Sequence, residues 1–245
     1  MSRECAFCPS TADLTGEHLW SHWMDDLFPG KKRFTSKNEK GEIIKQWEDA
    51  SLSWKAKVVC RRCNNGWMSD MESKHAKPAM TGLIRGNEEA TITKSHARSI
   101  ALFGFKTAVI FDHMQRGRVP FFPQRARYRF RQCLAIPFNV SMWLAGFLPI
   151  GKGEVHTSYH DGTSESGNRL ELYVCTYAVG HLAFQVVAAR QTGLTLFSPG
   201  DGFEHLAIPF WPRLRLGTRW PPNYVLRTVG DFDEFSRRWE TIIIR

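Results

Sequence analysis

Four cysteines of this chain form two Cys-x-x-Cys pairs, Cys5 with Cys8 and Cys60 with Cys63, and 51 residues separate the pairs. Two such pairs have the number and local spacing of ligands of a tetrahedral zinc site, in which each pair supplies two thiolates. The alternative is that the thiols are simply buried. In a reducing compartment paired cysteines are more often metal ligands than disulfides, so the sequence predicts one structural zinc ion (Zn2+).

Three residues beside these pairs have side chains that could carry out a reaction. Glu17 and His18 follow the first pair, and Asn64 directly follows Cys63. An imidazole can act as a base near neutral pH, whereas carboxylate and amide oxygens suit Mg2+ or Mn2+. Hydrolysis of a phosphodiester needs such a base and such a cation. The alternatives are that His18 is a packing or surface histidine, and that Asn65 competes with Asn64 as the ligand.

The order of these motifs resembles the zinc-containing branch of the HNH endonucleases over residues 5–75. The resemblance implies a ββα-metal fold, with His18 as general base and Glu17 and Asn64 as ligands of one catalytic Mg2+ or Mn2+. The middle asparagine of the family's signature corresponds to Lys55, which could contact a phosphate instead. Glu72 has no role in that signature and is expected to be structural or exposed.

Charge favours a polyanionic partner. The chain has 33 Lys and Arg against 24 Asp and Glu, a net charge of +9, which suits nucleic acid or another anionic surface equally; DNA is the partner expected here. The first hypothesis is a metal-dependent HNH-type endonuclease that hydrolyses DNA phosphodiester bonds. The second is a catalytically inactive zinc-ribbon protein that binds nucleic acid, in which Lys55 marks loss of the active site.

A second basic feature lies far from the cysteines, where arginines alternate with apolar residues. If this segment is an extended strand, four guanidinium groups share one face and could bind nucleic-acid phosphates. The alternative is a solvated strand face, or one that pairs with acidic residues elsewhere. The four residues are Arg125, Arg127, Arg129 and Arg131.

The hydrophobic pattern predicts an α+β protein with two parts. Residues 1–80 are expected to form a zinc-bound HNH-like module, and residues 81–245 a larger α+β domain with antiparallel strands, which could bind substrate or form a homo-oligomer. The boundary is placed between residues 76 and 90. Helical spacing predicts helices over 19–28, after Asn64, over 95–113 and over 231–242; strand-like composition predicts strands over 134–147, 170–178 and 181–189. Residues 30–45 are expected to form a basic loop or exposed hairpin.

No run of about eighteen apolar residues occurs, and the sequence starts without an apolar signal segment. The expectation is therefore a soluble, cytoplasmic protein with no membrane contact. Cys133 and Cys175, which stand alone in apolar surroundings, are expected to be buried.

Overall fold

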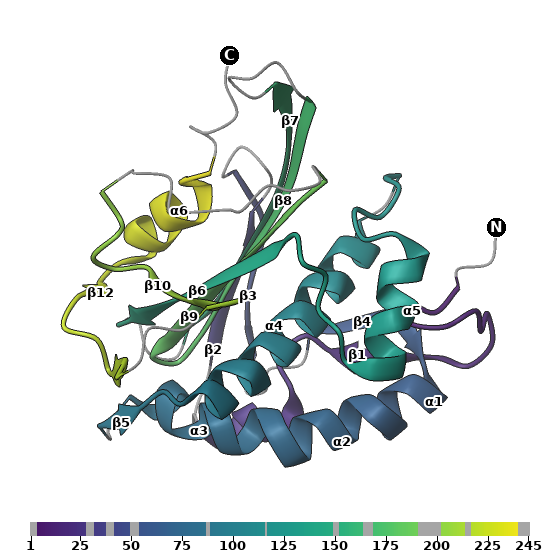
Figure 1. Ribbon diagram of the computed structural model, residues 1–245, viewed down its shortest axis with the longest axis horizontal. Helices are drawn as coiled ribbons and strands as arrows, with labels where there is room; N and C mark the ends of the chain where they lie inside the picture. Colours follow the sequence, from purple (N-terminus) through teal and green to yellow (C-terminus); the bar gives the residue numbers. More distant parts are fainter. Residues whose placement is uncertain are drawn as a thin grey trace.

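The computed structural model describes residues 4–27, 32–37, 42–49, 54–86, 89–115, 117–148, 152–163, 169–190, 202–213 and 217–239. Within these ranges the chain is a mixed α+β protein, as the sequence predicts, and Figure 1 shows its helices packed around a curled sheet. None of the helices described there has the length and apolar character that crossing a membrane requires.

The N-terminal part is built on two short strands and a long helical run. Strand β1 (Leu14–His18) pairs antiparallel with β4 (Lys55–Cys60), and the register places His18 opposite Lys55. A helix is predicted over 19–28, and the structure has a short 3-10 helix there, η1 (His22–Leu27). The chain leaves β4 directly into five consecutive helical segments: α1 (Arg61–Cys63), η2 (Asn64–Met68), α2 (Ser69–Met71), η3 (Glu72–Ala76) and α3 (Lys77–Arg85).

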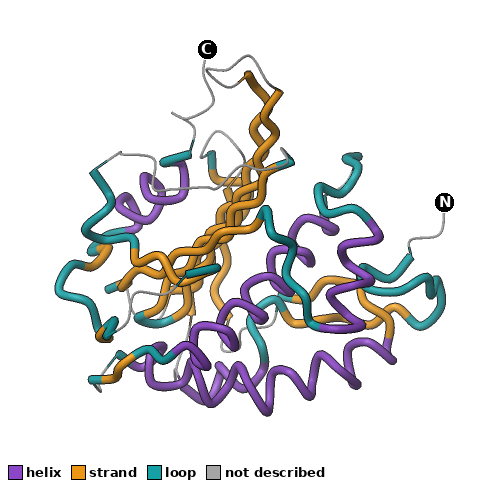
Figure 2. Tube along the Cα trace, viewed as in Figure 1, coloured by secondary structure: helices purple, strands orange, loops and turns teal. Residues whose placement is uncertain are grey.

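These helical segments end at Gly86, which has a φ of 66°. That left-handed conformation is the usual helix-terminating one, and glycine adopts it without steric strain. The helix predicted after Asn64 is therefore confirmed, and it continues through the predicted domain boundary. Figure 2 shows the run as one long coil along the lower edge of the molecule. The division into two domains stays a prediction.

The large sheet has eight strands in the order β10-β6-β9-β8-β7-β2-β3, with β12 beside β6. All neighbours are antiparallel except β2 with β7 and β12 with β6. The strands, together with the separate short pair β5 and β11, are β2 (Lys32–Lys37), β3 (Ile43–Asp49), β5 (Ala90–Thr91), β6 (Val140–Phe147), β7 (Lys152–Thr163), β8 (Arg169–Val179), β9 (Leu182–Ala189), β10 (Ile208–Trp211), β11 (Arg219–Trp220) and β12 (Val225–Leu226).

Strands β2 and β3 come from the basic stretch between the two cysteine pairs, where a loop or hairpin is predicted. They form an antiparallel hairpin, and β2 lies directly beside β7 of the large sheet. Part of the segment between the cysteine pairs, the β2–β3 hairpin, thus belongs to the same sheet as the C-terminal strands, whereas β1 and β4 form a separate two-stranded sheet (Figure 1).

Each face of the large sheet carries its own apolar cluster because side chains alternate along a strand. Met142 and Leu144 of β6 belong to the cluster that includes helix α4 (Lys94–Met114). Trp143 and Ala145, between them, pack instead with helix α6 (Val229–Arg237) on the opposite face. In Figure 1 these two helices lie on opposite sides of the strands.

Helix α4 is the central helix of the first cluster, and it confirms the helix predicted over 95–113. The Thr93 side chain caps its start by accepting a hydrogen bond from the His96 backbone N–H at 3.1 Å. Gly104 allows close approach to β9, since a Cβ there would lie 3.4 Å from the Phe184 ring. The same cluster includes the four paired cysteines, so the N-terminal part and the sheet share one core.

The structure confirms some of the predicted strands and corrects the bounds of other elements. The strands over 170–178 and 181–189 are confirmed, with Gly180 in the turn at φ 56°. The strand predicted over 134–147 begins only at Val140, and α6 begins at Val229 with a capping box of Thr228 and Asp231. Strand β7 was not predicted. Cys175 is buried as expected, whereas Cys133 is exposed.

The arginine-rich segment is a helix, α5 (Gln124–Cys133), so the prediction of an extended strand with four guanidiniums on one face is wrong. Alternation every two residues spreads side chains around a helix, which repeats every 3.6 residues. Accordingly Arg127 is buried, whereas Arg125 and Arg129 are exposed and Arg131 is half-buried.

Candidate metal centre and reaction site

The four cysteines of the two pairs meet in one buried cluster. Their sulfur atoms all lie within 4.8 Å of one another, and the Cys8 and Cys60 sulfurs are 3.6 Å apart. In a tetrahedral zinc site with Zn–S bonds of about 2.3 Å, the sulfurs are separated by about 3.8 Å. The number, identity and spacing of the donors fit zinc, and the cluster could hold one structural zinc ion.

Hydrogen bonds favour the thiolate form of Cys5, whereas the pKa of Cys63 is raised by its hydrogen bond to Cys5 and that of Cys8 is raised by burial. The N–H groups of Phe7 and Cys60 donate to the Cys5 sulfur at 3.4 and 3.3 Å. Hydrogen bonding from the Cys63 thiol, followed by these backbone N–H groups, lowers the pKa of Cys5 to about 4. A thiol with such donors is ready to act as an anionic ligand, since the thiolate is the form that binds metal.

Helix α5 holds the first cysteine pair in place from the side. The buried Arg127 guanidinium donates to the carbonyl oxygens of Ala6 and, at 3.0 Å, Phe122. The Phe7 ring packs edge-on against Trp67 of the helical run, with centroids 5.2 Å apart. One arginine predicted to contact nucleic acid is therefore bonded to the loop between Cys5 and Cys8.

Beside the cysteine cluster, the end of β1 and the first half of the helical run line a pocket of about 210 Å3. It contains all three residues for which the sequence predicts chemistry, brought from positions that are up to 47 residues apart. The β1–β4 pairing and the helix that follows β4 set this arrangement. The lining residues are Glu17, His18, Ser21, His22, Asn64, Asn65, Met68, Ser69 and Glu72.

His18 is placed to act as a neutral base. Burial lowers the pKa of His18, and the positive charge of Lys55, opposite it in the strand register, lowers it further. The His18 and His22 rings meet edge to face at 6.0 Å between centroids. An imidazole with a lowered pKa is deprotonated at neutral pH and can accept a proton.

Glu17 is buried, and it forms an ion pair that the sequence analysis did not predict. Its Oε1 accepts a hydrogen bond from Lys106 Nζ at 2.9 Å, and Lys106 Nζ also donates to Glu72 Oε1 at 2.5 Å. Burial by itself lowers the pKa of Lys106, but the charges of Glu17 and Glu72 more than offset this and raise it. Burial raises the pKa of Glu17 against the opposing charge of Lys106. The short contacts to both carboxylates favour the ammonium form of Lys106.

Asn64 is held in a defined orientation by the strand pair. Its Nδ2 donates to Thr15 Oγ1 at 3.1 Å, and Thr15 Oγ1 donates to the Val59 carbonyl at 3.2 Å. Nδ2 is therefore the amide atom that faces Thr15, and Oδ1 is the atom that could bind a cation. Asn65, the competing candidate, lines the same pocket, so both asparagines remain available as ligands.

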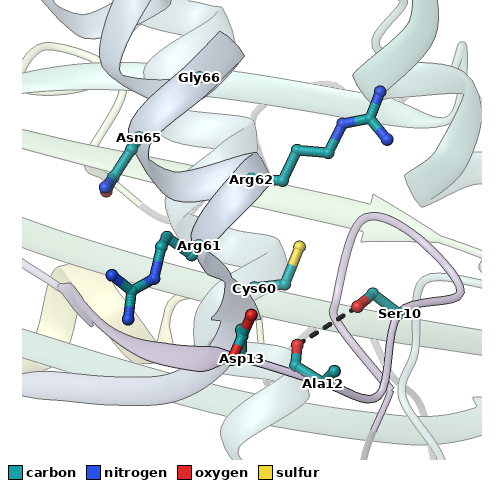
Figure 3. Close-up of a pocket in the computed structure, with 8 residues that line it drawn as sticks. All are labelled: Ser10, Ala12, Asp13, Cys60, Arg61, Arg62, Asn65 and Gly66. Carbon is teal, nitrogen blue, oxygen red and sulfur yellow. Dashed lines mark hydrogen bonds between the residues drawn. The ribbon is translucent and has the colours of Figure 1, made fainter.

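A second, larger pocket of about 510 Å3 lies at the start of the helical run, between it and the loop before β1 (Figure 3). Asn65 lines both pockets. Figure 3 shows the exposed Arg61 and Arg62 side chains extending in different directions from the helix. The backbone carbonyl oxygen of Asp13, on the facing loop, accepts a hydrogen bond from the Arg61 backbone N–H at 2.9 Å.

The sequence did not predict the roles of Glu72, which lines the first pocket, and Lys106, which lies behind it and pairs with Glu17 and Glu72. Lys106 lies in a mostly apolar stretch of α4, and Glu72 was expected to be structural or exposed. A lysine inside an apolar helix signals acidic partners, because a buried charge needs them. The sequence does not indicate which acids these are, since Glu17 precedes Lys106 by 89 residues.

No protein-family model matches this sequence, and no curated protein or solved structure is significantly similar to it. The functional argument therefore rests on the chain's own residues and their arrangement.

Proposed function

We propose that this protein is a metal-dependent endonuclease of the HNH type that hydrolyses DNA phosphodiester bonds. The observation that carries the proposal is the shared pocket of Glu17, His18 and Asn64 at the junction of an antiparallel strand pair and the helix that follows it. In this proposal the four-cysteine cluster binds a structural zinc ion, which fixes the start of the helix against the loop that leads to β1.

His18 would act as the general base in this reaction. Its imidazole takes a proton from a water molecule, whose oxygen attacks phosphorus as the bond from phosphorus to the leaving oxygen breaks. Glu17 and Asn64 supply the oxygen ligands for one Mg2+ or Mn2+. When bound, such an ion neutralises charge on the phosphate and the leaving oxygen. The lowered pKa of His18 supports the role of base.

Exposed cations of β4 and α5 would hold the DNA backbone. Lys55 lies across the strand pair from His18, and Arg125 and Arg129 are four residues apart on α5, which places them on the same side of that helix. Contacts of this kind bind phosphates without reading bases, and binding through them weakens as salt concentration rises.

A second candidate is a zinc-containing nucleic-acid-binding protein without catalytic activity. Two observations favour it: Lys55 stands where the family's signature has the middle asparagine, and the Glu17 carboxylate is already paired with Lys106. Both candidates predict DNA binding, and they differ in whether bonds are cut.

Nicking of supercoiled plasmid by the zinc-loaded chain with Mg2+ or Mn2+ distinguishes the two candidates. The comparison includes His18→Ala and a matched control, His96→Ala, which removes an exposed histidine at the start of α4. We expect wild type and His96→Ala to nick DNA and His18→Ala to lose activity by at least about a hundredfold, the usual contribution of a general base. DNA binding without nicking by wild type would support the second candidate.

A further inference from the structure

Lys106 places a positive charge in the interior, directly beneath the pocket. Its side chain is 1% exposed, and its ammonium group lies 4.8 Å from the centroid of the Phe103 ring. A charge in such surroundings is strongly unfavourable unless it is paired, and Glu17 and Glu72 provide two carboxylates for one ammonium. With both carboxylates and the ammonium ionised, the trio carries one negative charge.

The two carboxylates lie between this ammonium and the cavity. Glu17 and Glu72 line the pocket, whereas Lys106 is not among its lining residues. Each carboxylate uses Oε1 for the ammonium and has Oε2 as a second oxygen. The side chain of Glu72 is 16% exposed and that of Glu17 is 6% exposed, so Glu72 is the more accessible of the two.

The helical run brings Glu72 and Asn64 to the same cavity. The run departs from regular α-helical geometry at Gly66, which has φ -100° and ψ -114°. Asn64 and Glu72 nevertheless both line the pocket. The cavity is bordered by two amide side chains, Asn64 and Asn65, and by two carboxylates, Glu17 and Glu72. Their oxygens are hard donors of the kind that Mg2+ and Mn2+ prefer.

An independent observation indicates that something polar belongs in this cavity. Ser21 lines it and is 3% exposed, and within the part of the chain that the structure describes its hydroxyl has no hydrogen-bond partner. A buried hydroxyl without a partner is unfavourable. A water molecule on a bound cation, or a phosphate oxygen, would supply the missing hydrogen bond.

We propose that Glu72 is a further protein ligand of the divalent cation, which it binds together with Glu17 and Asn64. This inference rests on the proposed function, because it assigns a residue to the metal site of that reaction. The remaining negative charge of the trio attracts the cation, and Lys106 fixes the two carboxylates side by side so that both can reach it.

Binding of Mn2+ to the zinc-loaded protein, measured by calorimetry or by electron paramagnetic resonance of the free ion, tests this assignment. The variant is Glu72→Gln, which keeps the shape of the side chain and removes its charge. The matched control is Asp70→Asn on the same helical run, where Asp70 is exposed and pairs with Lys74. Zinc content and thermal unfolding verify that each protein is folded.

We expect Glu72→Gln to weaken Mn2+ binding about tenfold or more, in line with the loss of groups that support metal sites, and Asp70→Asn to change it less than about twofold. An affinity of folded Glu72→Gln within about twofold of wild type would overturn the assignment. Absence of Mn2+ binding by wild type would overturn it as well.

Plasmid nicking by the same proteins separates this inference from the proposed function. If Mn2+ binding depends on Glu72 but wild type cuts no DNA, the cation site stands and the nuclease proposal fails. If wild type nicks DNA and Glu72→Gln does so with the same Mn2+ dependence, the nuclease proposal stands and Glu72 is not a ligand.

Discussion

The four-cysteine cluster and the adjacent pocket use the same strand pair and the same helix, but they depend on the rest of the chain in different ways. The cluster takes its donors from two short motifs, supported by nearby backbone N–H groups. The pocket takes Glu17 and Asn64 from beside those motifs, but Lys106 of α4 fixes the charge at its base. A metal cluster can be specified locally, whereas a pocket with buried charges depends on a distant helix.

The largest effect is expected from breaking the cysteine cluster. Cys63→Ser should abolish stoichiometric zinc binding and destabilise the fold by several kcal/mol, because structural zinc supplies about 10–16 kcal/mol of apparent binding free energy in small zinc domains. Metal analysis measures the zinc content, and urea unfolding measures the loss of stability. Cys133→Ser, which alters an exposed thiol outside the cluster, should keep full zinc and wild-type stability. Full zinc content in Cys63→Ser would contradict the prediction.

The next effect is expected at the base of the pocket. Lys106→Met should lower the free energy of unfolding by about 3–5 kcal/mol, because it leaves two poorly exposed carboxylates without their counter-ion. Combining it with Glu17→Gln and Glu72→Gln should recover part of that loss. Urea unfolding measures the free energy of unfolding of the single and the triple variant, and both should retain zinc when folded. Equal stability of Lys106→Met and wild type would show that the ion pairs contribute little.

A smaller effect is expected where α5 contacts the cysteine cluster. Arg127→Met removes the donor to the Ala6 and Phe122 carbonyls and should destabilise the protein by about 1–3 kcal/mol. We also expect faster zinc transfer to a chelator, followed with a coloured zinc indicator. Arg129→Met alters an exposed arginine of the same helix and should match wild type. Equal transfer rates for the two variants would exclude support of the cluster by Arg127.

The smallest effect is expected at Thr15, the hydrogen-bond partner of the Asn64 side chain. Thr15→Val removes that bond and should lower stability by about 1 kcal/mol, with zinc content unchanged. It should also weaken Mn2+ binding a few-fold, because the Asn64 amide is no longer oriented. Calorimetry measures the affinity, and Thr81→Val, on the exposed side of α3, is the control. Unchanged Mn2+ affinity in Thr15→Val would indicate that Asn64 is not a ligand.

The sequence indicates the cysteine cluster because its ligands repeat in a local pattern that one zinc ion requires. The proximity of Glu17, His18 and Asn64 can also be predicted from the sequence, because each residue is close to a cysteine pair along the chain. Lys106 is different, because its neighbours follow from how α4 packs against the N-terminal part. Its position in an apolar helix implies acidic partners without identifying them.

The wrong prediction of a strand at α5 also arises because tertiary packing cannot be read from the local sequence. Arginines at every second position suggest a strand, but Ala126 and Phe130, four residues apart, also satisfy one face of a helix. Packing decides between the two, since Phe130 is fully buried against Phe105, with ring centroids 4.7 Å apart. Strand β7 is missed for the opposite reason. Its sequence is largely polar, yet Glu154, His156 and Ser158 are buried once β7 pairs along β8.

The hairpin of β2 and β3 has a practical consequence for cutting the chain into fragments. It is encoded between the two cysteine pairs, yet β2 hydrogen-bonds to β7 of the large sheet. A recombinant fragment that starts at residue 81 would expose the length of β7 that β2 covers, and an unpaired strand edge promotes aggregation. Expression of the whole chain avoids that exposed edge.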